Sequence, residues 1–137
     1  LADLLVLLQK GQVDFTLFFR RLGDVQRDYP AADTPVRDLC GDRAAFEAWA
    51  GRYRARLHAE HSQDIPRRRA MQAVNPKYVL RNYLAQIAID KAQQQDFSEV
   101  DRLRQVLDKP YDEQPENERY AALPPAWAHT LAVSCSS

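Results

Sequence analysis

The side chain best suited to chemistry of its own is the thiol of Cys135, which lies in the terminal run Ser-Cys-Ser-Ser. A short polar run exposes the sulfur, and exposed thiols are the ones open to redox reactions. The second cysteine, Cys40, follows a leucine and precedes an expected helix, where a cysteine packs as a small hydrophobic side chain. We therefore predict a redox role for Cys135, with an unpaired tail thiol of no function as the alternative.

A disulfide between the two cysteines is not expected. The two Cα atoms of a disulfide lie roughly 4.4 to 6.8 Å apart, and a cysteine at the packed start of a helix is poorly placed to meet a polar tail. We expect Cys135 to pair with a cysteine outside this chain, and Cys40 to remain a free thiol.

Two histidines, His58 and His61, lie near the end of another expected helix, with Glu60 between them. Two imidazoles and a carboxylate are a possible metal-binding set, but Glu60 points to one side and no third ligand follows at a recognisable spacing. Cationic side chains are also favoured at helix C-termini. We interpret both histidines as solvated or helix-capping residues and predict no metal site.

Arginines gather in two stretches, and their forked donors are suited to phosphate. Consecutive helical residues point about 100° apart, so three adjacent arginines cannot all face one anion. We interpret them as a solvated face, with an anion site as the alternative. These arginines are Arg52, Arg54, Arg56, Arg67, Arg68 and Arg69.

Motifs that hold nucleotides are missing from this sequence. Its four glycines are isolated, and it contains no G-x-G-x-x-G, Walker, H-R-D or D-F-G sequence. We predict that no catalytic or cofactor-binding residue lies in this chain.

The central element that positions the rest is a helix expected to begin at Asn75 and Pro76. An asparagine can cap a helix through its side-chain oxygen, and proline suits the first helical position. Arg81 and Asn82 are polar residues within this apolar helix, so we predict that they bridge to the backbone of a neighbouring segment. The apolar face of this helix is expected to comprise Val79, Leu80, Tyr83, Leu84, Ile87 and Ala88.

The remaining pattern predicts an all-α fold without strands. We expect helices over residues 1–9, 42–61 and 66–74, and others that begin near Asp14 and Ser98, with Asp14, Asp42 and Ser98 as caps. The second helix should bury Phe15, Phe18, Phe19 and Leu22, and the last should bury Val100, Leu103 and Leu107.

Residues 1–109 should therefore form a helical subdomain. Residues 110–137 should form a proline-rich surface wrap with a polar tail, pinned by Tyr111, Tyr120 and Leu123. The two parts are expected to form one structural unit.

Composition excludes several partners. Nineteen basic and nineteen acidic residues cancel, so no overall charge attracts nucleic acid or an anionic membrane surface. No apolar run approaches the roughly 20 residues that span a bilayer. The chain begins with a leucine that already has helical spacing with the leucines after it. This suggests that the chain is a C-terminal fragment of a longer protein.

Several short motifs in fixed order resemble the C-terminal end of the selenoprotein O family. They are NPKYVLRNYLAQIAID, DFSEVDRLRQVL, PYDEQP, YAALPPAWA and the final SCSS. The resemblance is close over residues 71–137 and weaker, mainly in spacing, over residues 1–70.

The resemblance implies a kinase-like protein adenylyltransferase that moves AMP from ATP onto hydroxyl side chains of proteins. It implies that the ATP and Mg²⁺ sites lie upstream of Leu1, that this fragment is inactive alone, and that it packs on the kinase-like lobe. The implied location is the bacterial cytoplasm. Animal members are similar to this tail and place selenocysteine near it, which implies redox use of Cys135. A helical protein-interaction module remains the alternative.

Overall fold

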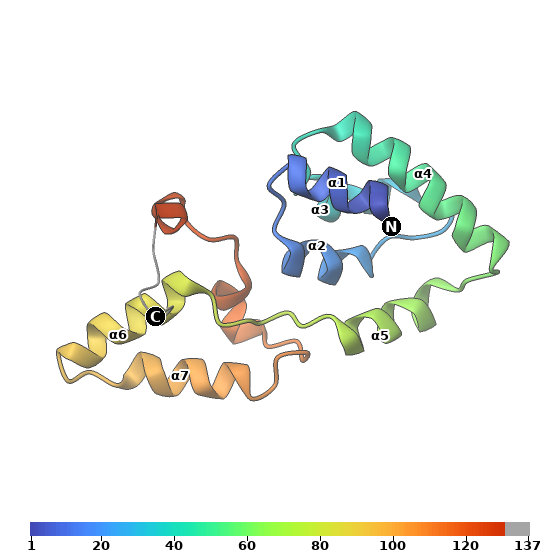
Figure 1. Cartoon of the computed structure of the whole chain (residues 1–137). Helices are drawn as coiled ribbons and strands as arrows, with labels where there is room; N and C mark the ends of the chain where they lie inside the picture. The colour runs from blue at the N-terminus through green and yellow to red at the C-terminus, as the bar shows by residue number, and fades with distance from the viewer. Residues whose placement is uncertain (131–137) are drawn as a thin grey trace. The chain divides into compact units, whose positions relative to one another are not determined.

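The structure is a computed structural model that describes residues 1–130, so Cys135 lies outside the described residues. Within this range the regular elements are α-helices and 3-10 helices, and no strand occurs, which confirms the predicted all-α fold (Figure 1). The chain divides into two compact units. The first unit spans Leu1–Asn75 and the second begins at Pro76, whereas the sequence suggested a division at residue 109.

The first unit contains five α-helices and one 3-10 helix. Two of the predicted caps are confirmed: the Asp14 carboxylate accepts a hydrogen bond from Leu17 N at 2.9 Å, and that of Asp42 accepts one from Ala45 N at 3.0 Å. The elements are α1 (Ala2–Lys10), α2 (Phe15–Leu22), η1 (Pro30–Asp33), α3 (Thr34–Arg37), α4 (Arg43–Ala59) and α5 (Asp64–Val74).

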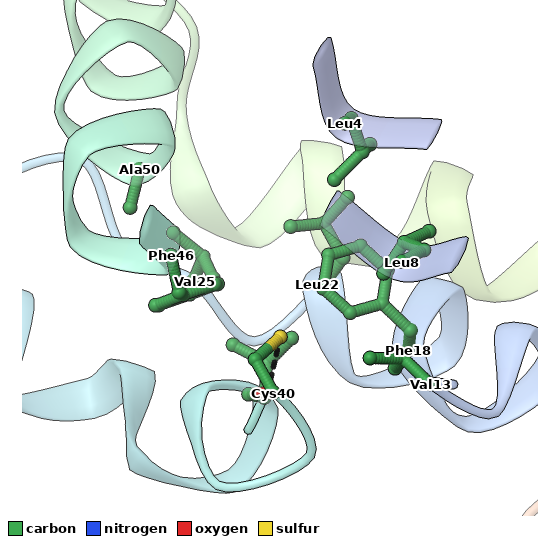
Figure 2. Packing of buried hydrophobic residues seen from close by; sticks show 10 residues of the cluster. Leu4, Leu8, Val13, Phe18, Leu22, Val25, Cys40, Phe46 and Ala50 are labelled. Carbon is green, nitrogen blue, oxygen red and sulfur yellow. Dashed lines mark hydrogen bonds between the residues drawn. The ribbon is translucent and has the colours of Figure 1, made fainter. Parts of the chain in front are cut away.

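Apolar side chains from four of these helices form the core of the first unit (Figure 2). Phe18 and Phe46 are completely buried. Cys40 is buried in the same cluster, as predicted, with its thiol 3.9 Å from the carbonyl oxygen of Val36, and burial raises the pKa of this thiol. Phe15, which the sequence placed in the core, is exposed. The core comprises Leu4, Leu8, Val13, Phe18, Leu22, Val25, Val36, Cys40, Phe46 and Ala50.

Asn75 ends a helix instead of beginning one. Its side-chain amide donates to the carbonyl oxygen of Met71 at 2.8 Å, as a C-terminal cap of α5. The buried guanidinium of Arg20 donates to the carbonyl oxygens of Gln72 at 2.9 Å and Asn75 at 3.0 Å. These bonds satisfy carbonyl groups that a helix end leaves without intrahelical partners.

The prediction that a helix begins at Asn75 and Pro76 is therefore wrong. Residues 76–81 are not helical, and α6 begins only at Asn82. The physical reason is a distant acceptor: the backbone N–H groups of Lys77 and Tyr78 donate to the carbonyl oxygen of Pro110, at 2.8 and 3.2 Å.

The second unit consists of two α-helices that pack on each other and of 3-10 segments that follow them. Its elements are α6 (Asn82–Gln93), α7 (Ser98–Leu107), η2 (Pro115–Ala121) and η3 (Ala126–Thr130). Its buried apolar residues are Tyr78, Tyr83, Leu84, Ala88, Leu103, Val106, Tyr120 and Ala121.

Three details of this unit differ from expectation. Phe97 occupies the N-cap position of α7 without a side-chain cap hydrogen bond, and Ser98 is the first helical residue, so Ser98 is not the cap. The carboxylate of Asp96 accepts from the N–H of Ser98 at 3.0 Å. The buried stripe of α7 includes Val106, whereas Val100 is exposed. Leu80 in the preceding segment is also exposed.

Of the three side chains predicted to pin the proline-rich segment, one is buried. Tyr120 is buried as predicted, whereas Tyr111 and Leu123 are exposed. Residues 76–109 belong to the same compact unit as this segment, because the contacts that hold it come from residues 77–106.

Candidate functional site

Residues 76–78 hold the proline-rich segment through a set of contacts that we call the lysine clamp, formed by Lys77, Tyr78, Glu113, Gln114 and Glu118. The ammonium group of Lys77 forms ion pairs with the carboxylates of Glu113 and Glu118. The hydroxyl of Tyr78 donates to the carbonyl oxygen of Gln114 at 3.0 Å and accepts from its backbone N–H at 3.2 Å. Gln114, which lies outside regular structure, thus has both its backbone N–H and its backbone carbonyl group paired.

The side chain of Gln114 ties the clamp to the end of α7. Its amide nitrogen donates to the carbonyl oxygens of Val106 at 3.0 Å and Lys109 at 2.9 Å. Burial lowers the pKa of Lys77, but hydrogen bonds with the two glutamates outweigh burial and hold it above its usual value. The ammonium group therefore remains charged at neutral pH.

A second polar cluster, the Glu99 cluster, lies on α7 and comprises Glu99, Arg102, Arg119 and Tyr120. Glu99 is only 5% exposed. One carboxylate oxygen accepts from Arg102 at 2.8 Å and Arg119 at 3.2 Å, and the other accepts from the Tyr120 hydroxyl at 3.0 Å. The ammonium group of Lys91 lies 3.8 Å from the first oxygen. A buried carboxylate is stable only with such partners.

The electrostatics of this cluster keep the carboxylate ionised. Burial raises the pKa of Glu99, but hydrogen bonds from Arg119 and Tyr120 outweigh burial and hold it below its usual value. Burial and the bond to Glu99 raise the pKa of the Tyr120 hydroxyl. Both pKa values move away from neutral pH, so at neutral pH the carboxylate of Glu99 is ionised and the hydroxyl of Tyr120 keeps its proton. The contacts of the cluster hold the segment in place.

Arg81 and Asn82 line a shallow hollow beside the C-terminal segment. Arg81 is the half-buried residue that precedes α6, and Asn82 is the exposed first residue of that helix. Leu80, Tyr83, Pro124 and Ala128 complete a hollow of about 310 Å³. The Trp127 ring packs edge-on against Tyr83, with centroids 5.8 Å apart. The predicted bridges of Arg81 and Asn82 to a neighbouring backbone stay predictions.

His58 and His61 lie in the first unit and are both exposed. His58 Nε2 is 3.0 Å from a carboxylate oxygen of Asp28, and His61 follows the end of α4 with a left-handed backbone (φ 50°). Among residues 1–130, no group of three histidine, cysteine, aspartate or glutamate side chains is arranged to hold a metal ion.

Five of the arginines pair with carboxylates of their own unit and do not gather around one anion site. The interpretation as a solvated face is wrong for Arg54 and Arg67, whose side chains are 14% and 10% exposed. Arg67 also donates to the carbonyl oxygen of Val25 at 2.8 Å. The pairs are Arg52 with Asp3, Arg54 with Asp33, Arg56 with Glu60, Arg67 with Asp64 and Arg68 with Asp24.

Sequence reasoning found Tyr120 but missed Glu99, Arg119, Lys77 and Arg20. Each of these side chains has a partner 20 to 55 residues away in the sequence, which no local motif reveals. The i, i+3 pair of Glu99 with Arg102 gives no sign that Glu99 is buried. The only sequence signal for Glu99 would have been a charged residue at a helix position that is predicted to be buried. The predicted buried stripe of α7 comprised Val100, Leu103 and Leu107 and did not include Glu99.

Comparison with known proteins identifies the family. The profile of the family described as protein adenylyltransferase SelO matches residues 1–108. The chain belongs to the SelO family. The match covers the first unit together with α6 and α7, so it includes Lys77 and Glu99 but ends before the clamp's acidic partners.

Two SelO relatives extend the similarity through the C-terminal segment. The chain is 63% identical over 134 residues to the protein nucleotidyltransferase YdiU of Herminiimonas arsenicoxydans, which covers 98% of this chain and 27% of that protein. It is 60% identical over 137 residues to that of Cupriavidus pinatubonensis, which covers 100% of this chain and 26% of that protein. The chain therefore spans about a quarter of the length of these relatives.

No helix among residues 1–130 has both the length and the apolar composition needed to cross a bilayer.

Proposed function

We propose that this chain is the C-terminal part of a protein adenylyltransferase, which transfers AMP from ATP to hydroxyl side chains of proteins. The observation that carries the proposal is the SelO match over residues 1–108, together with relatives named as protein nucleotidyltransferases. In this proposal the chain supports a kinase-like lobe formed by the rest of the polypeptide, in the bacterial cytoplasm.

ATP and Mg²⁺ are assigned to the part of the protein outside this chain. Among residues 1–130 no group of three potential ligand side chains is arranged to hold a metal ion, and the family resemblance assigns the ATP and Mg²⁺ residues to the preceding part of the polypeptide. The carboxylates of the lysine clamp and of the Glu99 cluster are already paired with cationic side chains. No step of the transfer is therefore derived from residues of this chain.

The test compares the full-length protein with residues 1–137 alone. With ATP labelled on its α-phosphate, Mg²⁺ and a protein acceptor, the full-length protein should label the acceptor and the shorter chain should not. Label transfer by residues 1–137 alone would place a nucleotide site here and contradict the assignment. A full-length protein that labels neither acceptor proteins nor itself would contradict the proposed function.

The finer part of the proposal is redox control through Cys135. Two thiols, that of Cys135 and one from the rest of the protein, would form a disulfide and give two electrons and two protons to a disulfide oxidant such as oxidised glutathione. Cys40 is a poor partner, because it is buried and burial raises its pKa. The disulfide would close a long loop and restrict movement near the nucleotide site.

We test this by measuring AMP transfer with oxidised and reduced glutathione. Oxidation should lower transfer in the wild type, and Cys135→Ala should abolish the difference, whereas the control variant Cys40→Ala should keep it. Equal redox sensitivity in Cys135→Ala, or a peptide map that links Cys40 to Cys135, would rule out the proposed switch.

A further inference from the structure

The middle of helix α1, residues 4–8, is apolar around its whole circumference. Residues 4–8 are five consecutive apolar residues, and at about 100° per residue five positions go more than once around a helix. Leu4 and Leu8 are buried in the first unit, while Leu5 and Val6 are 43% and 48% exposed. Helices that are apolar on all sides are typical of the interior of larger proteins.

Two hollows are lined by residues of both α1 and α4, and Val6 of the exposed side lines the larger one. One hollow, of about 680 Å³, includes Val6, Leu7, Ala48 and Trp49 among its lining residues. The other, of about 470 Å³, includes Phe19, Trp49, Tyr53 and Met71. Trp49 of α4 lines both hollows, and α4 contacts α1, as Figure 1 shows. We call Leu5, Val6 and Trp49, with these two hollows, the α1 surface.

Two of the four charged residues that line the larger hollow, Asp3 and Arg52, neutralise each other, and the other two are Lys10 and Asp42. Asp3 of α1 and Arg52 of α4 line both hollows and form an ion pair with each other at 2.6 Å. The Trp49 ring stacks on Tyr53, with centroids 5.1 Å apart and planes at 12°. An apolar partner therefore fits Leu5, Val6 and the Trp49 ring, and it would cover Asp3 and Arg52 without leaving either of these two charges unpaired.

We infer that the α1 surface is covered, in the full-length protein, by an apolar helix face from the part of the same polypeptide that precedes residue 1. This inference rests on the proposed function, in which that part is the kinase-like lobe. About three quarters of the length of the relatives lies outside this chain. Elements that follow one another in sequence are usually neighbours in space, and α1 is the first element after that part.

Thiol labelling of the full-length protein tests the inference. Leu5→Cys and Val6→Cys are treated with a maleimide, native and in urea, and the modified peptides are quantified by mass spectrometry. Because a covered site reacts only through opened states, we expect labelling about tenfold or more slower in the native protein than in urea. The matched control Ala44→Cys, at an exposed position of α4, should label at nearly the same rate in both.

Hydroxyl-radical footprinting of the wild-type protein gives a second measurement without substitutions. Leu5 and Val6 should be oxidised slowly compared with Leu80 and Val74, residues of the same types that are 58% and 70% exposed. Rapid labelling and rapid oxidation at the α1 surface would overturn the inference. Protection that disappears on dilution, together with a halved molecular mass, would also overturn it, because a second copy would then be the covering partner.

Labelling is measured independently of AMP transfer. Protection in a protein that transfers no AMP would support the covered α1 surface and overturn the proposed function. Transfer of AMP by a protein whose α1 surface labels rapidly would leave the proposed function standing and overturn the covered surface.

Discussion

The core of the first unit is packed around phenylalanine rings. In the second unit, a tyrosine hydroxyl, a lysine and a buried carboxylate hold an irregular segment in place. In the first, Phe18 and Phe46 are fully buried among aliphatic side chains. In the second, Tyr78 and Tyr120 are equally buried, but each has its hydroxyl in a polar contact with a distant residue.

The difference follows from backbone chemistry. A helix satisfies its own N–H and C=O groups, so packing helices together needs only apolar surface. A proline-rich segment with few internal hydrogen bonds needs partners for its polar groups from elsewhere. The second unit therefore holds its irregular segment through polar contacts, whereas α1 to α4 of the first unit pack on one another through an apolar core.

The largest effect is expected from breaking the apolar core of the first unit. Phe18→Ala in the full-length protein should lower the free energy of unfolding of this unit by about 3 to 5 kcal/mol, because it removes a buried ring and leaves a cavity. Native-state hydrogen exchange in peptides from residues 1–75 measures the loss. Tyr29→Ala, at an exposed aromatic position, serves as the control and should change stability by less than about 0.5 kcal/mol.

A smaller effect is expected from breaking the Glu99 cluster. Glu99→Ala leaves the Tyr120 hydroxyl without its acceptor in a buried site, which should cost about 1 to 3 kcal/mol. Arg102 and Arg119 are half exposed and can return to water, which limits the loss. Hydrogen exchange should accelerate in peptides from residues 110–121, while Glu116→Ala, at an exposed position, should not accelerate it. Unchanged exchange in Glu99→Ala would show that apolar contacts alone hold the segment.

The smallest effect is a pH dependence confined to the second unit. Because hydrogen bonds hold the pKa of Glu99 below its usual value despite burial, the folded carboxylate binds its proton less readily than the unfolded one. This contribution is complete above the unfolded pKa, about 4.3, and is lost as the pH falls through the lower folded pKa. Between pH 6 and pH 3, the free energy of unfolding measured by urea denaturation should fall less in Glu99→Gln than in the wild type. An equal loss of stability in the two proteins would show that other carboxylates cause the acid sensitivity.

Sequence reasoning succeeded where the signals are local. The Asp14 and Asp42 caps, the buried Phe18 and the buried Cys40 all follow from residues within one or two helical turns. It failed at Asn75, where an equally valid local pattern predicted a helix start. The competing acceptor, the carbonyl oxygen of Pro110, lies more than 30 residues away, and no local pattern reveals it.

The candidate site was less predictable than the fold. Tyr120 was expected to anchor the C-terminal segment, but nothing near Glu99 indicated that this carboxylate would be buried with Arg119. The sequence suggested contacts for Arg81, Asn82 and Cys135, and these contacts stay predictions. Long-range polar pairs leave no periodic pattern, because each depends on the final position of a segment without regular structure.

The lysine clamp behaves as a chelate. Each of its contacts closes a loop of 36 to 41 residues, and the entropy of closing such a loop is lost once, when the first contact forms. The later contacts then form at high effective concentration, so loss of any one is largely compensated by the others. Substitutions at Lys77 and Tyr78 should therefore be strongly non-additive. The strength with which the lysine clamp holds the proline-rich segment depends on all of its residues together and cannot be assigned to any single one.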